Sequence, residues 1–350
     1  MRCYCVIKHG EPLELIEKAT PEPDGTEVLV RVRAAGLCHT DLHLWEGYYD
    51  LGGGKKLMLA DRGLKPPLTL SHEIAGEVVS GGKQAGDIRP GAKVLIHPWI
   101  GCGACAACAR GEENICAKPQ ALGVVRPGGF AEYVLVPHPR YLVDLANLDP
   151  SAAAPLACAG VTVYSALKKF RNRIHEGPVV VFGAGGLGLM AIQVLKAMGG
   201  IGAIVIARDP AKREAALAAG ALAVMDLRDD DLVASIVRAT DGGARAVLDL
   251  VSAPETIAAA LASLARGGHI VACGLIGGEI TLALPSIVLR PFTLEGSYVG
   301  TVDELRELVT LAETGKLATI PVQRRPLAEV NSAIEDLSHG RVSGRAVLIP

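Results

Sequence analysis

The sequence predicts an α/β protein that combines a doubly wound parallel sheet with a second, mostly β unit. Beyond Pro150, short apolar strands alternate with alanine-rich helical stretches. This alternation is typical of βαβ units, whose parallel sheet is covered by helices on both faces. Before Pro150, short strands are separated by Gly and Pro, as in antiparallel sheets with irregular loops.

The individual elements follow from the period of the apolar residues. In the segment Glu27–Ala34, apolar and basic residues alternate, which predicts a half-exposed strand. Three more segments before Pro150 have a similar character: Glu73–Ser80, Lys93–His97 and Phe130–Pro137. Beyond Pro150 we predict strands at 179–182, 203–207, 223–227, 246–250 and 269–274, a helix from Gly186, a helix at Asp303–Thr314 and a terminal strand at 345–349.

The composition excludes several classes of partner. Half of the 350 residues are apolar, so a large core can form and wholesale disorder is excluded. The net charge of −2 lacks the basic excess that binding to a nucleic acid or an anionic membrane requires. The uncharged stretch Gly177–Leu195 is better explained as a strand, a glycine turn and a helix than as a membrane span. We therefore expect neither a nucleic acid nor a membrane as partner.

The glycine turn carries the first functional signal. Gly183-Ala-Gly185-Gly186-Leu187-Gly188 fits G-x-G-x-x-G and stands between an apolar strand and a helix. In that position the first glycine permits a tight turn, the second lets a pyrophosphate approach the backbone, and the third lets helix and strand pack closely. The helix N-terminus adds free N–H groups for the phosphates. The segment predicts a Rossmann-type dinucleotide site.

The end of the next strand bears on the coenzyme. An NAD site usually has a carboxylate about 20 residues further on, which binds the adenosine ribose. Here Ala207 and Arg208 stand at that position, which leaves room for a 2′-phosphate and a guanidinium to pair with it. Asp209 follows and could reach the ribose after a small loop adjustment. The sequence favours NADP over NAD.

The cysteines indicate metal binding. The segment MRCYCVIKHGEPLEL lacks the basic and then apolar pattern of a secretory signal, so we expect a cytoplasmic protein with reduced thiols. Four cysteines with C-x2-C-x2-C-x7-C spacing can close a tetrahedral shell around a structural zinc, or hold an iron–sulfur cluster: Cys102, Cys105, Cys108 and Cys116. Cys38, His72 and Cys158 have the ligand types of an open catalytic zinc site, but spacing alone does not join them.

One family has all these motifs in the same order. They are Cys38-His-Thr-Asp-Leu-His43, His72-Glu73, the four-cysteine loop, Gly128-Gly-Phe-Ala-Glu-Tyr133, Cys158-Ala-Gly-Val-Thr162, the glycine turn and Gly296-Ser-Tyr-Val-Gly300. Over essentially the whole chain, the sequence resembles the zinc-dependent medium-chain alcohol dehydrogenases, most closely the tetrameric microbial kind. The resemblance implies reversible NAD(P)-dependent oxidation of an alcohol to an aldehyde or ketone, with zinc as Lewis acid. It also implies a GroES-like catalytic domain at 1–158 and 299–350, a Rossmann domain at 159–298, and a homotetramer or homodimer.

The resemblance assigns roles to single residues. It implies two zinc ions per chain, with Cys38, His72 and Cys158 as catalytic ligands and the four-cysteine loop around the structural ion. Near the catalytic ion, the resemblance implies that Glu73 lies beside the ligands or binds the ion transiently and that Asp41 orients the histidine. It implies that Thr40 and His43 form the proton relay and that Trp99 is a wall of the alcohol pocket. Coenzyme contacts fall to His39 and Arg345 at the pyrophosphate, Lys212 near the adenosine ribose and Thr162 beside the nicotinamide.

Departures from the family pattern are few. The pair Ala207 and Arg208 replaces the acid of the NAD type, residues 49–66 form a longer link than usual, and Ser71 stands where a glycine usually precedes the histidine ligand. Two alternatives keep part of the pattern. One is a zinc-free quinone or enone reductase of the same superfamily, and the other is an NADP-binding redox sensor with the cysteine loop as its switch.

Overall fold

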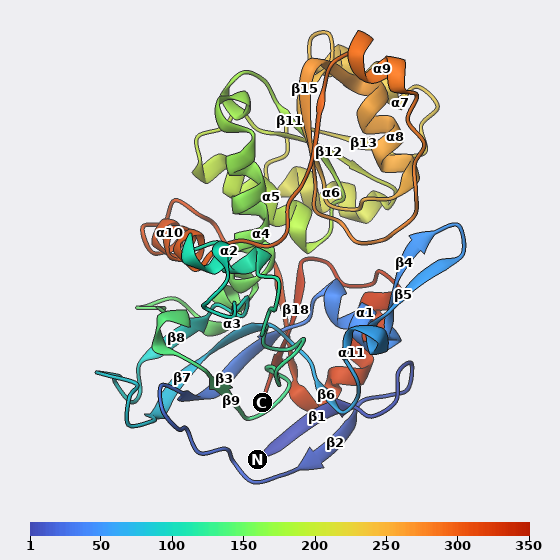
Figure 1. Cartoon of the computed structure of the whole chain (residues 1–350). Coiled ribbons are helices and arrows are strands. Elements are labelled where there is room, and N and C mark those ends of the chain that lie inside the picture. The colour runs from blue at the N-terminus through green and yellow to red at the C-terminus, as the bar shows by residue number, and fades with distance from the viewer. The chain divides into compact units, whose positions relative to one another are not determined.

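The computed structural model describes all residues, 1–350, and divides into two compact units (Figure 1). The first unit consists of Met1–Tyr48, Met58–Val161 and Gly300–Pro350. The second consists of Tyr49–Leu57 and Thr162–Val299. The sequence had divided the chain at 158 and 298 and had placed residues 49–57 with the first unit.

The first unit is built on two mostly antiparallel sheets, in which β17 and β18 form a parallel pair. Its larger sheet has the order β10-β8-β7-β3-β18-β17, and β9 also pairs with β3. The strands are β3 (Val28–Gly36), β7 (Glu73–Gly81), β8 (Lys93–Ile96), β9 (Tyr133–Val136), β10 (Leu142–Asp144), β17 (Val322–Pro326) and β18 (Arg345–Ile349). A smaller sheet has the order β2-β1-β6, from β1 (Arg2–Val6), β2 (Glu14–Glu17) and β6 (Leu68–Thr69).

The four strands predicted before Pro150 are confirmed as β3, β7, β8 and β9. In β3 the valines are buried while Arg31 and Arg33 are exposed, as the alternating pattern predicted. Arg33 pairs with Glu77 of β7 across the sheet at 2.7 Å. Period-two alternation thus places β3 with one face in the core and a charged face toward solvent.

Helical elements of the first unit cover and connect these strands. The α-helices are α1 (His39–Glu46), α2 (Ala106–Ala109), α3 (Pro150–Ala153), α10 (Val302–Glu313) and α11 (Val330–Ser338). The 3₁₀ turns are η1 (Leu59–Arg62), η2 (Glu113–Ile115), η3 (Pro139–Tyr141), η4 (Ala154–Ala157) and η6 (Leu327–Glu329). α4 (Ala159–Lys169) begins in the first unit and continues in the second.

The second unit is a six-stranded parallel sheet with the order β13-β12-β11-β14-β15-β16. This is the Rossmann order 3-2-1-4-5-6, so the predicted fold class is confirmed. The strands are β11 (Val179–Phe182), β12 (Ala203–Ala207), β13 (Ala223–Asp226), β14 (Ala244–Asp249), β15 (Leu264–Ala272) and β16 (Thr293–Gly296). The helical elements are η5 (Arg171–His175), α5 (Gly186–Ala197), α6 (Pro210–Ala218), α7 (Leu232–Ala239), α8 (Pro254–Ser263) and α9 (Leu284–Leu289).

The core of this unit explains why the sequences of its central strands are continuously apolar. Every residue of β11 and β12 is buried. On one face, Val180 and Phe182 pack in a cluster with Ile236 of α7 and Ile257 of α8. Because strand neighbours point to opposite faces, the alternate residues of β11 face the other side of the sheet. Figure 1 shows α7 and α8 lying together beside the sheet.

A β-hairpin within the long link belongs to the second unit, contrary to the expected division. It consists of β4 (Tyr48–Gly52) and β5 (Lys55–Met58). A Cβ atom on Gly52 would lie 2.7 Å from the backbone of Gly278 and Glu279, so the hairpin packs directly on that loop. Sequence alone did not indicate this contact, because it depends on the close approach of two glycine-rich backbones.

No single helix has the length and apolar character needed to cross a membrane. One bent pair, Pro150–Ala157 with Ala159–Lys169, passes this test by length and composition alone, with an angle of 47°. The stretch Gly177–Leu195 contains β11 and most of α5, as the sequence predicted.

Candidate metal and coenzyme sites

Three residues from distant parts of the chain meet in the interior of the first unit. Cys38 immediately precedes α1, His72 precedes β7, and Cys158 follows η4. Their ligand atoms all lie within 4.8 Å of one another, and the two sulfur atoms are 3.9 Å apart. Each side chain is buried. The structure brings together the three residues that spacing could not join.

The donor atoms of this group fit a zinc ion. Two sulfurs bound tetrahedrally at the usual zinc–sulfur length lie about 3.8 Å apart. Both ring nitrogens of His72 are buried and have no hydrogen-bond partner. A buried polar atom without a partner is costly, and a bound cation removes that cost.

Asp41 organises the approach of two of these ligands. Its Oδ2 accepts a hydrogen bond from the Cys38 backbone N–H at 2.8 Å. Its Oδ1 accepts one from the Ser71 N–H at 2.9 Å and lies 3.6 Å from Nδ1 of His72. The carboxylate is completely buried and directs Nδ1 of the imidazole toward itself. This leaves Nε2 as the atom available to a metal.

Ser71 occupies a backbone conformation that favours glycine. Its φ is +71°, in the left-handed region. The hydroxyl donates a hydrogen bond to the Gly36 carbonyl at 2.9 Å. Serine thus stands where the family pattern has glycine. Its backbone is strained, and the hydrogen bond of its side chain compensates for that strain.

Glu73 and Arg345 form a buried ion pair beside the three ligands. Nη2 of Arg345 contacts Oε1 of Glu73 at 2.5 Å, and Nε contacts Oε2 at 3.0 Å. Burial raises the pKa of Glu73 to about 7, although the guanidinium opposes this shift. A Cβ atom on Gly36 would lie 2.1 Å from Oε2 of Glu73, so glycine there makes room for the carboxylate. The sequence had expected Arg345 at a pyrophosphate; the structure pairs it with Glu73.

Trp99 contacts the same group. Its ring centroid lies 5.1 Å from that of His72, and its Nε1 donates to the Ala157 carbonyl at 3.2 Å. The side chain is 4% exposed. The indole thus packs on His72 and donates a hydrogen bond to Ala157, the residue that precedes Cys158.

Thr40, His43 and His39 lie on α1, directly after Cys38. His43 is half-buried, with Nδ1 3.9 Å from Oε2 of Glu46. Burial lowers the pKa of His43. Thr40 is half-buried and His39 is exposed.

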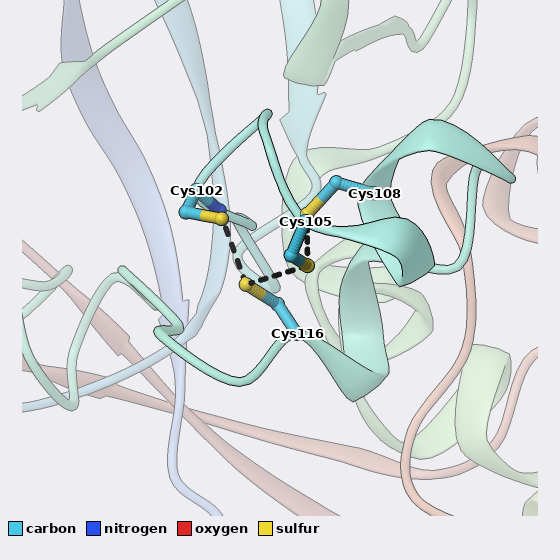
Figure 2. A group of neighbouring side chains, drawn as sticks. All are labelled: Cys102, Cys105, Cys108 and Cys116. Atoms are coloured by element: carbon cyan, nitrogen blue, oxygen red, sulfur yellow. Dashed lines mark hydrogen bonds between the residues drawn. The ribbon is translucent and has the colours of Figure 1, made fainter.

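The four cysteines of the predicted structural metal site lie together, as Figure 2 shows. The Sγ atom of Cys105 is 3.5 Å from that of Cys108 and 3.8 Å from that of Cys116. The Sγ atom of Cys116 accepts backbone hydrogen bonds from Cys102 and Lys118. Hydrogen bonds from the backbone at Cys108 and other donors lower the pKa of Cys105 to about 6. Four sulfurs turned inward, with amide donors around them, fit a closed tetrahedral zinc site.

Glu113 anchors this loop to the first unit, and sequence reasoning did not find it. Its carboxylate accepts hydrogen bonds from the Gly101 N–H and the Tyr141 hydroxyl, at 3.2 and 2.6 Å. It also pairs with Arg140 at 2.7 Å. An acid three residues before the last cysteine was the only sequence signal.

In the second unit, the glycine turn has the geometry that its motif predicts. Gly183 has a φ of +105°, which only glycine adopts readily. No atom lies within 4 Å of a Cβ built on Gly185, so its backbone is open to a ligand. A Cβ on Gly188 would lie 2.0 Å from the Gly183 carbonyl oxygen. Gly186 and Leu187 form the first turn of α5.

The strand end next to this turn is rich in arginine. Ala207 ends β12 and is in register with Asp226, the end of β13. Arg228 contacts Asp226 at 2.8 Å and also donates to the Arg208 carbonyl at 2.9 Å. Arg213 contacts Asp226 at 3.1 Å and donates to the Ala207 carbonyl at 2.7 Å. The sequence had named only Arg208 and Lys212 here, because Arg213 and Arg228 are brought in by a helix and a neighbouring strand.

The carboxylate of Asp209 already accepts a hydrogen bond within the chain. Its Oδ1 accepts a hydrogen bond from the Ala211 N–H at 2.9 Å and caps the start of α6. Arg208 pairs with Glu255 at 2.5 Å. Lys212 is half-buried on α6, and Thr162 is buried with its hydroxyl lacking a hydrogen-bond partner.

Comparison with known proteins decides the family. Residues 24–147 match the family model described as alcohol dehydrogenase GroES-like domain, and residues 186–314 match that of zinc-binding dehydrogenase. The chain is 38% identical to an NAD-dependent alcohol dehydrogenase of Sulfurisphaera tokodaii, covering 100% of both chains. This chain belongs to the medium-chain zinc-dependent alcohol dehydrogenases.

Other relatives extend the comparison. The chain is 36% identical to a D-arabinose 1-dehydrogenase (NADP(+)) of Saccharolobus solfataricus, covering 98% of this chain and 96% of the relative. The crystal structure of an alcohol dehydrogenase from Aeropyrum pernix superposes with a TM-score of 0.90 at 33% identity and covers both chains completely. The predicted reaction class is therefore confirmed: this dehydrogenase is an oxidoreductase that acts on alcohols.

Proposed function

We propose that this dehydrogenase reversibly oxidises an alcohol to an aldehyde or ketone with NADP+ or NAD+, and that it holds a catalytic and a structural zinc ion. The observation that carries the proposal is the meeting of Cys38, His72 and Cys158 within 4.8 Å in the interior of one unit. The reductase alternative, which lacks the metal, has no use for three converging donors and an imidazole without a partner.

Cys38, His72 and Cys158 would hold the zinc ion, which would supply Lewis-acid chemistry to the alcohol when bound. Asp41 holds the His72 ring in the tautomer that exposes Nε2. Glu73, neutralised by Arg345, adds a buried carboxyl group beside the ligands without adding a net charge. Trp99 limits the rotation of the His72 ring and narrows the space around it.

Thr40 and His43 are the proposed proton-transfer residues. A threonine hydroxyl can accept the alcohol proton and donate its own, and Thr40 follows the ligand Cys38 by two positions on α1. His43 lies nearly one turn further along the same helix. Because burial lowers the pKa of His43, its ring is neutral and can accept a proton at neutral pH.

The coenzyme is assigned to the second unit, where NADP is favoured over NAD. The pyrophosphate would bind at the open backbone of Gly185 and the N-terminus of α5, formed by Gly186, Leu187 and Gly188, after the tight turn at Gly183. A coenzyme held there would supply the hydride acceptor of the reaction.

The coenzyme preference rests on the end of β12. Ala207 offers no carboxylate to a ribose, and Asp209 is held as a helix cap. Arg208 and Arg228 offer guanidinium groups to a 2′-phosphate, with Lys212 nearby on α6. We further assign His39 to the pyrophosphate and Thr162 to the nicotinamide, as the family resemblance implies, whereas Arg345 is engaged by Glu73.

The ligand set and the sheet edge bear on the cellular location and the quaternary structure of the enzyme. The six cysteines of the two metal groups can serve as zinc ligands beside His72 only when their thiols are reduced, which fits the reducing cytoplasm. For its quaternary structure we propose a dimer or tetramer in which β16 pairs with its counterpart. β16 is an edge strand of the sheet, and next to it the α9 residues Leu284, Val288 and Leu289 are 71–79% exposed.

Cys38→Ser tests the proposal directly, with Cys273→Ser as the matched control. Cys273 is a cysteine outside both metal groups. We expect two zinc ions per chain in the wild type and in the control, and one in Cys38→Ser. Turnover of alcohols should fall about 1,000-fold or more in Cys38→Ser, since it loses the Lewis acid.

The outcomes separate the alternatives. Full activity in Cys38→Ser contradicts the proposed mechanism. One zinc ion in the wild type, without oxidation of any primary, secondary, cyclic or sugar alcohol, would instead favour a redox sensor that uses the cysteine loop.

A further inference from the structure

A second concave, basic site lies in the nucleotide-binding unit, away from the glycine turn. A cavity of about 440 Å³ is lined by η5 and by the beginnings of β14 and β15. These elements lie at the amino ends of parallel strands, whereas the glycine turn follows the carboxyl end of β11. The cavity and the coenzyme site therefore lie at opposite ends of the parallel strands.

The lining of this cavity carries a positive charge that the chain leaves uncompensated. Four arginines line it, namely Arg171, Arg173, Arg245 and Arg266, and one acid, Glu176. Arg245 pairs with Glu176 at 3.4 Å. Arg173 donates to the Gly267 carbonyl at 3.4 Å and has no acidic partner.

Three lining side chains are available to a ligand. Arg171, Arg266 and the amide of Asn172 make no hydrogen bond or ion pair within the chain. Guanidinium groups held close together repel one another, and an anion placed among them removes that repulsion. The same groups offer the planar, paired N–H donors that bind phosphate in a bidentate manner.

The backbone of Arg171 has a conformation that is unusual for a residue other than glycine. Its φ is +53°, a conformation that glycine adopts without strain after a helix end. Here the chain keeps an arginine at that position. A glycine at this position would therefore remove the guanidinium without straining the backbone.

We propose that this cavity binds a small anion with a di- or polyphosphate group, held by Arg171 and Arg266 with Arg173 and Arg245 beside them. The volume suits a small ligand rather than a macromolecular surface. The site lies outside the coenzyme and metal sites, and its occupation requires neither zinc nor turnover.

Pyrophosphate is the probe, and titration calorimetry is the measurement. Because the glycine turn also binds pyrophosphate groups, the protein is first saturated with NAD+ and NADP+ together. We expect one pyrophosphate to bind per chain under these conditions, with an affinity that falls as salt is raised.

Two variants test the residues. Arg171→Gly removes the guanidinium and suits the local φ, so its melting temperature should stay the same or rise while affinity falls about tenfold. Arg266→Ser should weaken binding by a similar factor, and Arg62→Ser, an exposed arginine outside the cavity, should not. The proposal is overturned if the coenzyme-saturated protein does not bind pyrophosphate, or if Arg171→Gly and Arg266→Ser bind it as the wild type does.

Discussion

At the scale of single residues, Ser71 shows how a side chain can compensate for its own backbone. Its left-handed φ costs about 1 kcal/mol, and the hydrogen bond to Gly36 recovers a similar amount. We expect Ser71→Ala to be less stable than Ser71→Gly, because alanine keeps the strain and loses the hydrogen bond, whereas glycine relieves the strain. A difference of about 1–2 kcal/mol should appear in chemical denaturation. Equal stability of the two variants would contradict this account.

His97 predicts a pH dependence of stability. Its side chain is 1% exposed, and burial, assisted by Arg306, lowers the pKa to about 3. Between pH 6.5 and 3 the unfolded chain therefore binds a proton that the folded protein does not, so stability is lost as pH falls through this window. At pH 5 the loss amounts to about 2 kcal/mol. As the pH is lowered from 7 to 5, we expect the melting temperature of His97→Gln to fall less than that of the wild type. Equal falls in the two proteins would refute this role.

Ala207 is the residue at which coenzyme preference can be reversed. Ala207→Asp places a carboxylate where a 2′-phosphate would bind and where a ribose hydroxyl could be held. We expect the ratio of kcat/KM for NADP+ to that for NAD+ to fall at least about 100-fold. Arg228→Ala, which removes one guanidinium but adds no acid, should lower the ratio less. If the wild type turns over NAD+ alone, the assignment of the arginines is wrong.

At the scale of elements, the sequence predicted most of the strands and helices that carry the sites. β11 and β12 begin and end, and α5 begins, as the apolar pattern indicated, because fully buried strands and glycine turns have strong local signals. β14 and β15 begin earlier than the sequence predicts, and the sequence predicts no strands in the link 49–66, where β4 and β5 form a hairpin. In these cases pairing with a neighbouring strand, rather than local pattern, decides where the element starts.

Two alanine substitutions in the glycine turn separate coenzyme binding from folding. Gly185→Ala adds a methyl group where the protein has open space, so stability should be retained while coenzyme affinity falls at least about tenfold. Gly188→Ala places its Cβ against the Gly183 carbonyl, so α5 must move and both stability and affinity should fall. Thermal unfolding and coenzyme titration measure the two effects. Loss of stability in Gly185→Ala would contradict the assignment of that position to the ligand.

At the scale of the whole molecule, the edge of the parallel sheet predicts self-association. β16 offers unpaired backbone groups, and Val288 on α9 is 79% exposed. We expect Val288→Glu to shift the protein toward monomers in light scattering, since a charge there opposes burial of the apolar surface. Val125→Glu is the control, because Val125 is an exposed valine of the first unit. A monomeric wild type, or no effect of Val288→Glu, would remove the support for this interface.

The sequence by itself determined the fold class, the cysteine loop and the glycine turn, because each depends on residues that are close together along the chain. Tertiary structure decided the rest. It placed Cys38, His72 and Cys158 within reach of one ion, gave Glu73 the buried partner Arg345, and engaged Asp209 as a helix cap. Such contacts join segments separated by up to hundreds of residues, and only the packing of strands and helices sets the distances between their side chains.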